Sequence, residues 1–515
     1  MSIYSRETAR RSLLNMLGYR AISQITTLAG YVVLVRSLPE QSFGIYSLLY
    51  SFIPVLSTVA SLGIELTLKR FQPEYLRANN PAAAAWLLHV GMIARLTSNA
   101  LLIAVVLLAW NLLAPLFQLS GYRVDFALFG LLVLLYFQSR ILELALASYM
   151  LHRYSVGSTV LIALSRLAGY AILAALHAMT LRTAILADTF AFGLAYVFMR
   201  VAYRRNAADS RPVPGYRPPA AERKRILRYA LFNNFNDAGS ILLYTQTDNF
   251  FIAALLNPVA VGAYAFYTRI NAMASNLTPM RLFENVVQPL FFAIPPEQAS
   301  VRVPRYFTFL LNCSLTLQLP LIAYTAVYHR EIVSLLLGGK FQDISWLLPV
   351  VITFGTTSNV IAIPVTSVAQ YQERASLILS SQLFGLYQIA AMLLLVPAIG
   401  LLGAAVATGT YHLFRNLFVW WKVRREARWL NFSAVLAWAT LIWGVAMLGC
   451  FELKNAIAGP PIVALACGAA ICGVAALLYV RSPALCITDR ELLGQVFHGR
   501  EMRVLHKLGV LRQAG

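Results

Sequence analysis

Long apolar stretches separated by short polar ones run along the whole chain. Fourteen windows of mostly apolar residues are long enough to cross a bilayer as α-helices, which need about 20 residues. Alternating strands of about ten residues, the signature of an outer-membrane barrel, are absent. The pattern predicts an all-α integral membrane protein with about fourteen transmembrane helices. The predicted spans are 13–35, 43–64, 86–113, 126–150, 156–176, 184–202, 229–256, 262–292, 307–328, 346–368, 377–396, 401–421, 432–451 and 461–480.

Two turn sequences within this pattern resemble each other. Residues 37–46 and 256–264 both carry a Pro followed by Gly-x-Tyr, and Gly44 and Gly262 are 218 positions apart. In each turn the Pro cannot continue the preceding helix, and Gly-x-Tyr opens the next apolar stretch. The repeat predicts a duplicated six-helix unit, as in many transporters. Two fainter pairs keep nearly the same offset, namely 114–117 with 333–336 and 180–181 with 400–401.

The duplication predicts two pseudo-symmetric lobes of six helices. The connection between them is rich in Pro and charge, which is typical of a linker. Two further helices follow the second lobe, and the basic tail is interpreted as an amphipathic helix on the cytoplasmic leaflet or as a disordered segment. The predicted limits are 1–205 for the N-terminal lobe, 206–227 for the cytoplasmic linker, 228–425 for the C-terminal lobe, 426–481 for the last two helices and 482–515 for the tail.

The distribution of basic residues along the chain predicts its membrane topology. The net charge is +21, but only 12% of the residues are charged and 59% are hydrophobic, whereas about a quarter are charged in soluble proteins. Most Lys and Arg fall in the linker, the tail and alternate turns, which predicts that both termini are cytoplasmic. A nucleic-acid partner is therefore not needed to explain the excess of basic residues. The outer turns hold only Arg36, Arg123, Arg182, Arg330, Lys340 and Lys454.

Seven arginines fall inside the predicted spans. An Arg at mid-bilayer costs about 2.5–3.5 kcal/mol, so most of them are expected to face a hydrated interior. Such a cationic interior suits an anionic substrate that arrives from the cytoplasm. The candidate substrate-binding residues are Arg20, Arg95, Arg140, Arg166, Arg269, Arg281 and Arg415.

Other roles for some of these arginines stay open. Arg20 and Arg415 lie about two turns from the inner surface and could snorkel to it. Arg95 and Arg166 have no acidic residue one turn away on their own helix, so either a ligand role or a structural role fits them.

Acidic residues inside the spans are candidates for coupling to H⁺ or Na⁺, because burial favours the protonated carboxyl group. Asp237 and Asp248 are expected to share one stripe of a single polar helix. The alternative is that each acid pairs with an interior Arg, as the i,i+3 spacing suggests for Arg140–Glu143 and Arg281–Glu284. The candidates are Asp188, Asp237, Asp248, Glu143 and Glu284.

Motifs for enzyme chemistry are absent from the sequence. It contains no GxSxG, HExxH or P-loop. The five cysteines and seven histidines show no metal-binding spacing. The sequence predicts a protein that is not an enzyme and has no metal site and no cofactor.

Several short motifs resemble those of the Wzx-type polysaccharide flippases, a family of the multidrug/oligosaccharidyl-lipid/polysaccharide (MOP) exporter superfamily. They agree in order and spacing over the first twelve predicted helices. The first predicted helix lacks the Ser/Arg-rich pattern of the related lipid II flippases, which argues against a peptidoglycan precursor as substrate. The motifs are VRSLPE at 35–40, FGIYS at 43–47, LGIE at 62–65, RFQPEY at 70–75, TDNFFI at 247–252, GAY at 262–264 and EIVSLLLGGKF at 331–341.

The resemblance implies a MATE-like fold with alternating access in the bacterial inner membrane. The implied function is the flipping of an undecaprenyl-pyrophosphate-linked oligosaccharide for O-antigen, capsule or exopolysaccharide synthesis. The implied partners are membrane lipids, a polysaccharide polymerase and chain-length proteins. Two alternatives remain: a MATE-type antiporter coupled to H⁺ or Na⁺, and a membrane glycan polymerase or ligase, which the short outer turns disfavour.

Overall fold

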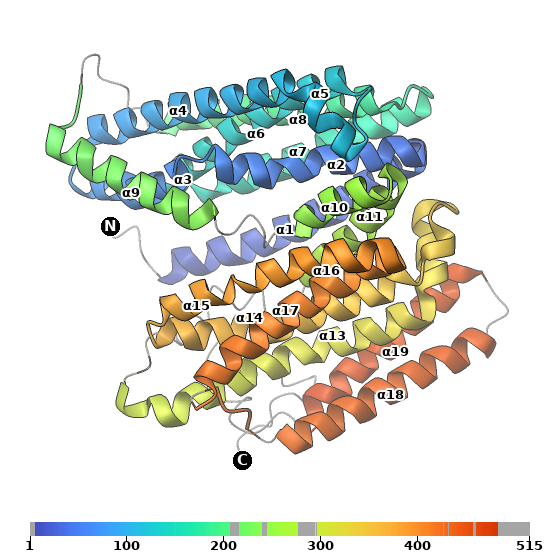
Figure 1. Ribbon diagram of the computed structural model, residues 1–515. Helices are drawn as coiled ribbons and strands as arrows, with labels where there is room; N and C mark the ends of the chain where they lie inside the picture. Colours follow the sequence, from blue (N-terminus) through green and yellow to red (C-terminus); the bar gives the residue numbers. More distant parts are fainter. Residues whose placement is uncertain are drawn as a thin grey trace. The chain divides into compact units, whose positions relative to one another are not determined.

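The computed structural model shows a chain built from helices (Figure 1). No strand occurs among the residues that it describes, which confirms the predicted all-α class. The described residues are 6–149, 151–206, 216–238, 245–276, 294, 296–425, 427–430, 432–456 and 460–482. The predicted helix or disordered segment in the tail lies outside these residues.

The chain divides into two compact units, Met1–Ala265 and Phe266–Gly515. In the first unit α1 packs against α7, α6 packs against α8, and α3 and α4 pack against each other and against α6. Helix α11 begins in this unit and continues into the second. The helices are α1 (Arg6–Ser37), α2 (Glu40–Val59), α3 (Ile64–Arg77), α4 (Pro81–Leu108), α5 (Trp110–Leu113), α6 (Arg123–Ser148), α7 (His152–Ala175), α8 (Leu181–Asn206), α9 (Ala220–Ala238), α10 (Asp248–Leu255) and α11 (Pro258–Asn276).

In the second unit α13 packs against three helices, α14, α18 and α19. Helix α17 packs against α14 and against α16. Cys450 of α18 and Cys472 of α19 are buried as free thiols in this core, in agreement with a packing role. The helices are α13 (Ala299–Leu337), α14 (Leu347–Tyr371), α15 (Ala375–Ser381), α16 (Phe384–Ile399), α17 (Leu401–Val423), α18 (Phe432–Ala456) and α19 (Pro461–Arg481).

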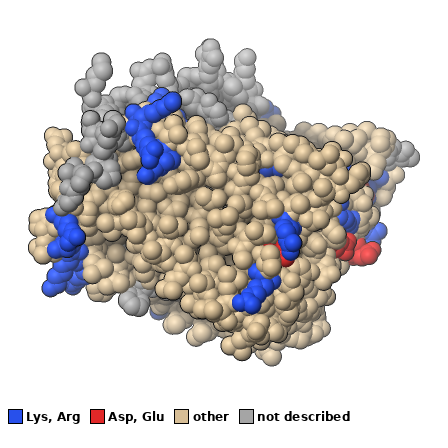
Figure 2. All heavy atoms as spheres, turned by 90° about the horizontal axis from the view of Figure 1, so that it is seen from above, with Lys and Arg blue, Asp and Glu red and all other residues tan. Residues whose placement is uncertain are grey.

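Among the described residues, nine helical segments are long and apolar enough to cross a membrane. The other five predicted spans coincide wholly or partly with α1, α9 and α10, α11, α14, and α17. The total of fourteen spans stays a prediction. The face in Figure 2 is mostly uncharged, with separated basic side chains, as expected for helices in contact with lipid.

The unit boundary falls later than the predicted boundary between the lobes. Helix α9, which opens the predicted second lobe, packs on α2 and α3. Ser61 Oγ donates to Asn234 Oδ1 at 2.6 Å, and a Cβ on Gly63 would lie 2.0 Å from the carbonyl oxygen of Ala230. The end of the predicted linker is also helical, because α9 begins at Ala220. The limits of the sequence repeat stay a prediction, since a repeat and a packing unit need not share a boundary.

One helix of the first unit, α3, was predicted only as the end of a span and a cytoplasmic turn. Its buried residues Ile64, Leu68, Phe71 and Tyr75 follow the spacing of three or four that one helical face requires. That face packs on α4 and α6. The resulting position brings Glu65 to the interior of the unit.

Candidate polar site in the first helical unit

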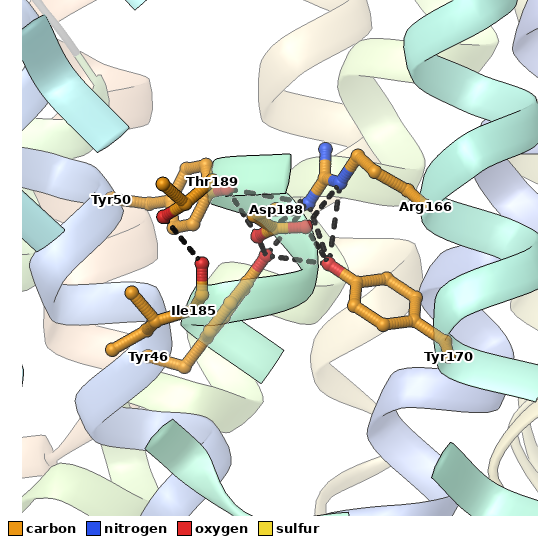
Figure 3. Close-up of polar contacts among 7 residues, drawn as sticks. All are labelled: Tyr46, Tyr50, Arg166, Tyr170, Ile185, Asp188 and Thr189. Atoms are coloured by element: carbon orange, nitrogen blue, oxygen red, sulfur yellow. Dashed lines mark hydrogen bonds and ion pairs between the residues drawn. The ribbon is translucent and has the colours of Figure 1, made fainter. Parts of the chain in front are cut away.

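A buried carboxylate is the centre of the first polar cluster (Figure 3). Asp188 has no exposed surface. It forms an ion pair with Arg166, with 2.7 Å between Nε and Oδ1. Tyr46 donates to Oδ2 at 2.6 Å, and the hydroxyl groups of Tyr50 and Tyr170 also donate to this carboxylate. The cluster therefore joins one acid, one base and three phenols inside apolar helices.

Three helices supply these side chains. Tyr46 and Tyr50 are one turn apart on α2, and Arg166 and Tyr170 are one turn apart on α7. Residues at this spacing lie on the same helical face. Asp188 comes from α8, which packs against both helices. The i,i+4 spacing thus places two polar side chains per helix toward one carboxylate.

The second polar cluster surrounds Arg95 on α4, whose side chain has no exposed surface. Its Nη1 donates to the backbone carbonyl of Ser57 at 3.0 Å, and its guanidinium lies 4.2 Å from the ring centre of Phe137. Its Nη2 is 3.8 Å from a carboxylate oxygen of Glu65. Arg95 therefore lies enclosed between an acid, a carbonyl group and an aromatic face.

Glu65 links this arginine to a second pair. Its other oxygen lies 3.7 Å from Nε of Arg140, and Arg140 Nη1 is 2.6 Å from Glu143. The structure thus contains the predicted i,i+3 pair. Ser155 on α7 donates to Glu143 at 2.7 Å. The result is a chain of alternating charges, from Arg95 through Glu65 and Arg140 to Glu143.

Arg95 and Arg166 have no acidic residue one turn away on their own helices, as the sequence shows. Each arginine pairs with an acid on another helix, Glu65 for Arg95 and Asp188 for Arg166. The alternative interpretation, that a buried acid pairs with an interior Arg, is confirmed for Asp188. Glu65 was missed as a site residue, although it ends the LGIE motif at 62–65.

The expected stripe of two aspartates on one unbroken α-helix was wrong. Residues Thr245–Thr247 form a 3₁₀ turn, so α-helical spacing does not extend to Asp248, which is the first residue of α10. Ser, Thr and Asn side chains compete with helical backbone hydrogen bonds. Asp248 is buried and accepts a hydrogen bond from Tyr264 at 3.0 Å. The side chain of Asp237 lies outside the described residues.

The remaining predicted site residues lie in the second unit or outside the described residues. Arg415 on α17 is half-buried and donates from Nε to Ser381 at 3.3 Å. Arg269 on α11 is exposed. The side chain of Arg20, and Arg281 and Glu284 entirely, lie outside the described residues.

Two solved structures are similar to this chain in fold. The structure of the lipid II flippase MurJ in an inward closed conformation matches with a TM-score of 0.65 and 11% identity, over 93% of this chain and 100% of the other. An inward-facing MATE family multidrug transporter matches with a TM-score of 0.64 and 14% identity, over 80% of this chain and 98% of the other. At these identities the matches show the fold alone.

The fold and its long apolar helices therefore define a multi-pass membrane protein. The sequence profile of one family matches more than half of the chain, residues 12–294. The chain belongs to this family, the polysaccharide biosynthesis proteins. Comparison with curated protein sequences gave no match.

Proposed function

We propose that this protein flips a polyprenyl-pyrophosphate-linked oligosaccharide from the cytoplasmic to the periplasmic leaflet of the bacterial inner membrane. The observation that carries the proposal is a transporter fold in a chain that belongs to a polysaccharide biosynthesis family. A polysaccharide pathway that needs such a fold has a lipid-linked glycan to move across the membrane. The product would be O-antigen, capsule or exopolysaccharide, with a polymerase and chain-length proteins as partners.

The arginines of the first unit differ in how well they could meet the pyrophosphate. Arg166 and Arg140 keep 18% and 39% of their side-chain surface exposed. Guanidinium groups suit phosphate oxygens because they are planar, permanently charged donors. Arg95 has no exposed surface, so in this conformation it is better suited to supporting Glu65 and Arg140. Binding of the head group followed by alternating access would then move it outward.

A flipping assay tests the proposal. Proteoliposomes would carry a fluorescent short-chain polyprenyl-pyrophosphate oligosaccharide, and a membrane-impermeant quencher would report the fraction in the outer leaflet. The wild type should equilibrate the lipid between leaflets, and Arg166→Ala should not. Arg204→Ala is the matched control, because Arg204 is exposed at the end of α8. No flipping by wild-type protein would reject the proposal.

The two alternatives give different results with the same preparation. A MATE-type antiporter would expel a cationic dye when a proton or sodium gradient is applied. A polymerase or ligase would change the length of the glycan or transfer it to an acceptor, which mass spectrometry detects.

A further inference from the structure

We propose that Tyr46, Tyr50, Tyr170 and Asp188 are positioning residues that hold one edge of the Arg166 guanidinium and present its other edge to a phosphate oxygen. The ligand class is an isoprenoid diphosphate. This inference rests on the proposed function, because the lipid-linked substrate supplies the phosphate.

The first step concerns the carboxylate of Asp188. It accepts five hydrogen bonds: Oδ1 from Tyr170 and from Arg166 Nε, and Oδ2 from Tyr46, Tyr50 and Arg166 Nη2. A carboxylate offers about four lone-pair positions. Its acceptor capacity is therefore filled by the protein. Asp188 is thus an anchor for Arg166.

The second step concerns the inner edge of the guanidinium, which is fully occupied. Nε donates to Asp188, and Nη2 lies 2.7 Å from the hydroxyl of Tyr46 and 3.0 Å from that of Tyr170. These two hydroxyl groups accept from Arg166 and donate to Asp188, so each bridges the ion pair. The rings of Tyr50 and Tyr170 also lie 5.6 and 5.7 Å from the guanidinium carbon. The group has little freedom to rotate.

The third step concerns the outer edge. Nη1 makes no hydrogen bond with any residue that the structure describes, and Figure 3 shows it pointing away from the carboxylate. A guanidinium has five N–H donors, of which two are on Nη1. Asp188 is completely buried, whereas the Arg166 side chain keeps 18% of its surface exposed. An anion that bound Nη1 would therefore not need to displace the carboxylate.

Arg166→Lys separates this arrangement from a simple ion pair. Lysine keeps the charge that balances Asp188, but it is a point charge without a second, rigidly held donor edge. A merely structural ion pair would tolerate the substitution. Presentation of Nη1 to a phosphate would not.

Tyr46→Phe tests the positioning role with the ring kept in place. It removes the hydroxyl that bridges Arg166 and Asp188. Tyr411→Phe is the matched control, because the buried Tyr411 hydroxyl has no hydrogen-bond partner among the described residues.

The experiment is equilibrium binding to the full-length protein in phosphatidylcholine nanodiscs, measured by calorimetry. The probes are farnesyl diphosphate and farnesol, which share the chain and differ in the phosphates. The wild type should bind the diphosphate more tightly than the alcohol. Arg166→Lys and Tyr46→Phe should each weaken diphosphate binding about tenfold or more, as expected for a hydrogen bond to a charged group, and leave farnesol binding unchanged. Tyr411→Phe should change neither.

Unchanged diphosphate affinity in Arg166→Lys, or an equal loss for farnesol in Tyr46→Phe, would overturn the inference. The thermal midpoint of each variant shows whether it is folded. If Arg166→Lys does not fold, Tyr46→Phe alone tests the inference. Failure of the proposed function looks different. If the protein binds farnesyl diphosphate through Arg166 but does not flip the glycolipid, only the proposed function is rejected. If Arg166→Lys still flips the glycolipid and binds farnesyl diphosphate as tightly as the wild type, only this inference is rejected.

Discussion

Gly44 and Gly262 lie against each other where α2 and α11 begin, and a Cβ on Gly262 would be 3.1 Å from the Cα of Gly44. These glycines belong to the two Gly-x-Tyr turns of the sequence repeat. A Cβ on Gly44 would come within 1.7 Å of the carbonyl oxygen of Pro258. Such a close backbone approach requires glycine. The two copies of the repeated turn are thus packed on one another.

The tyrosines of the two turns also make equivalent contacts. Tyr46 donates to the buried Asp188 at 2.6 Å, and Tyr264 donates to the buried Asp248 at 3.0 Å. Each tyrosine stands two residues after its glycine. The shared geometry favours duplication over chance similarity of the two turns. Where α2 and α11 cross, each helix carries a tyrosine that donates to a buried carboxylate.

The first prediction concerns the space at this crossing. Gly44→Ala should lower the free energy of unfolding by about 2–3 kcal/mol, because the methyl group meets backbone atoms that cannot rotate away. Gly262→Ala should cost less, since its nearest neighbour is a side-chain atom of Phe43 at 3.0 Å. Thermal unfolding in detergent measures the order. Gly473→Ala in α19 is the control, because nothing lies within 4 Å of its added methyl group, and an effect as large there would contradict the explanation.

Much of the fold could be predicted because membrane helices are long and apolar, and a charge inside one stands out. The same reasoning picked out Arg166 and Asp188 separately. It could not pair them, because they are 22 positions apart on different helices. Sequence spacing detects partners one turn away on a single helix, as for Arg140 and Glu143, and no others.

Helix α3 shows a second limit of sequence reasoning. Its 14 residues are too few for a span, and its basic positions resemble an ordinary cytoplasmic turn. Only the packing of its apolar face on α4 and α6 turns Glu65 inward. Glu65 was therefore missed, although its motif had been noticed.

The second prediction addresses the pairing of Arg95 and Glu65. Arg95→Ala should lower the free energy of unfolding by about 3 kcal/mol, because it breaks a buried ion pair and leaves the Ser57 carbonyl without its donor. Glu65→Gln should cost about 1 kcal/mol, since Glu65 is partly exposed. The double variant should cost less than the sum of the two. Chemical unfolding of all four proteins measures the coupling, and strict additivity would show that the two residues do not interact.

The third prediction concerns a bend in α13 at Tyr328, whose φ and ψ are not helical. The preceding carbonyl, that of Val327, accepts a hydrogen bond from Lys454 Nζ at 2.8 Å, and the same ammonium lies 2.8 Å from Glu331. Lys454→Met should lower the free energy of unfolding by about 1 kcal/mol. A fully buried hydrogen bond from a charged group would contribute more, but the lysine is partly exposed.

Thermal unfolding of Lys454→Met against Lys69→Met checks this value. Lys69 is exposed on α3, so its substitution should leave the midpoint unchanged. Equal midpoints for the two variants would mean that Lys454 does not hold α18 to the bend of α13.

The last prediction concerns the attachment of α9 to α3. Arg225 of α9 donates to both carboxylate oxygens of Glu74 at 3.0 and 3.2 Å, and Arg70 lies 3.0 Å from the same carboxylate. The hydrogen bonds that Arg225 donates to Glu74 raise the pKa of Arg225 above its usual value. A raised pKa adds stability that is fully present below the pKa of the unfolded chain and is lost only as the pH rises through the pKa of the folded protein. Between pH 6 and 9 the charge of Arg225 is therefore constant, and salt should weaken the contact more than pH does.

Charge reversal tests this attachment directly. Glu74→Arg would place a third positive charge beside Arg70 and Arg225 and should speed hydrogen exchange of the backbone amides in α9. Arg225→Glu in the same protein should restore slow exchange, because the pair is rebuilt with its signs reversed. Mass spectrometry of peptides from 220–238 measures the rates, and peptides from α19 serve as the internal control. Equal exchange in the single and double variants would show that packing at Gly63 and Ala230, not charge, holds α9 in place.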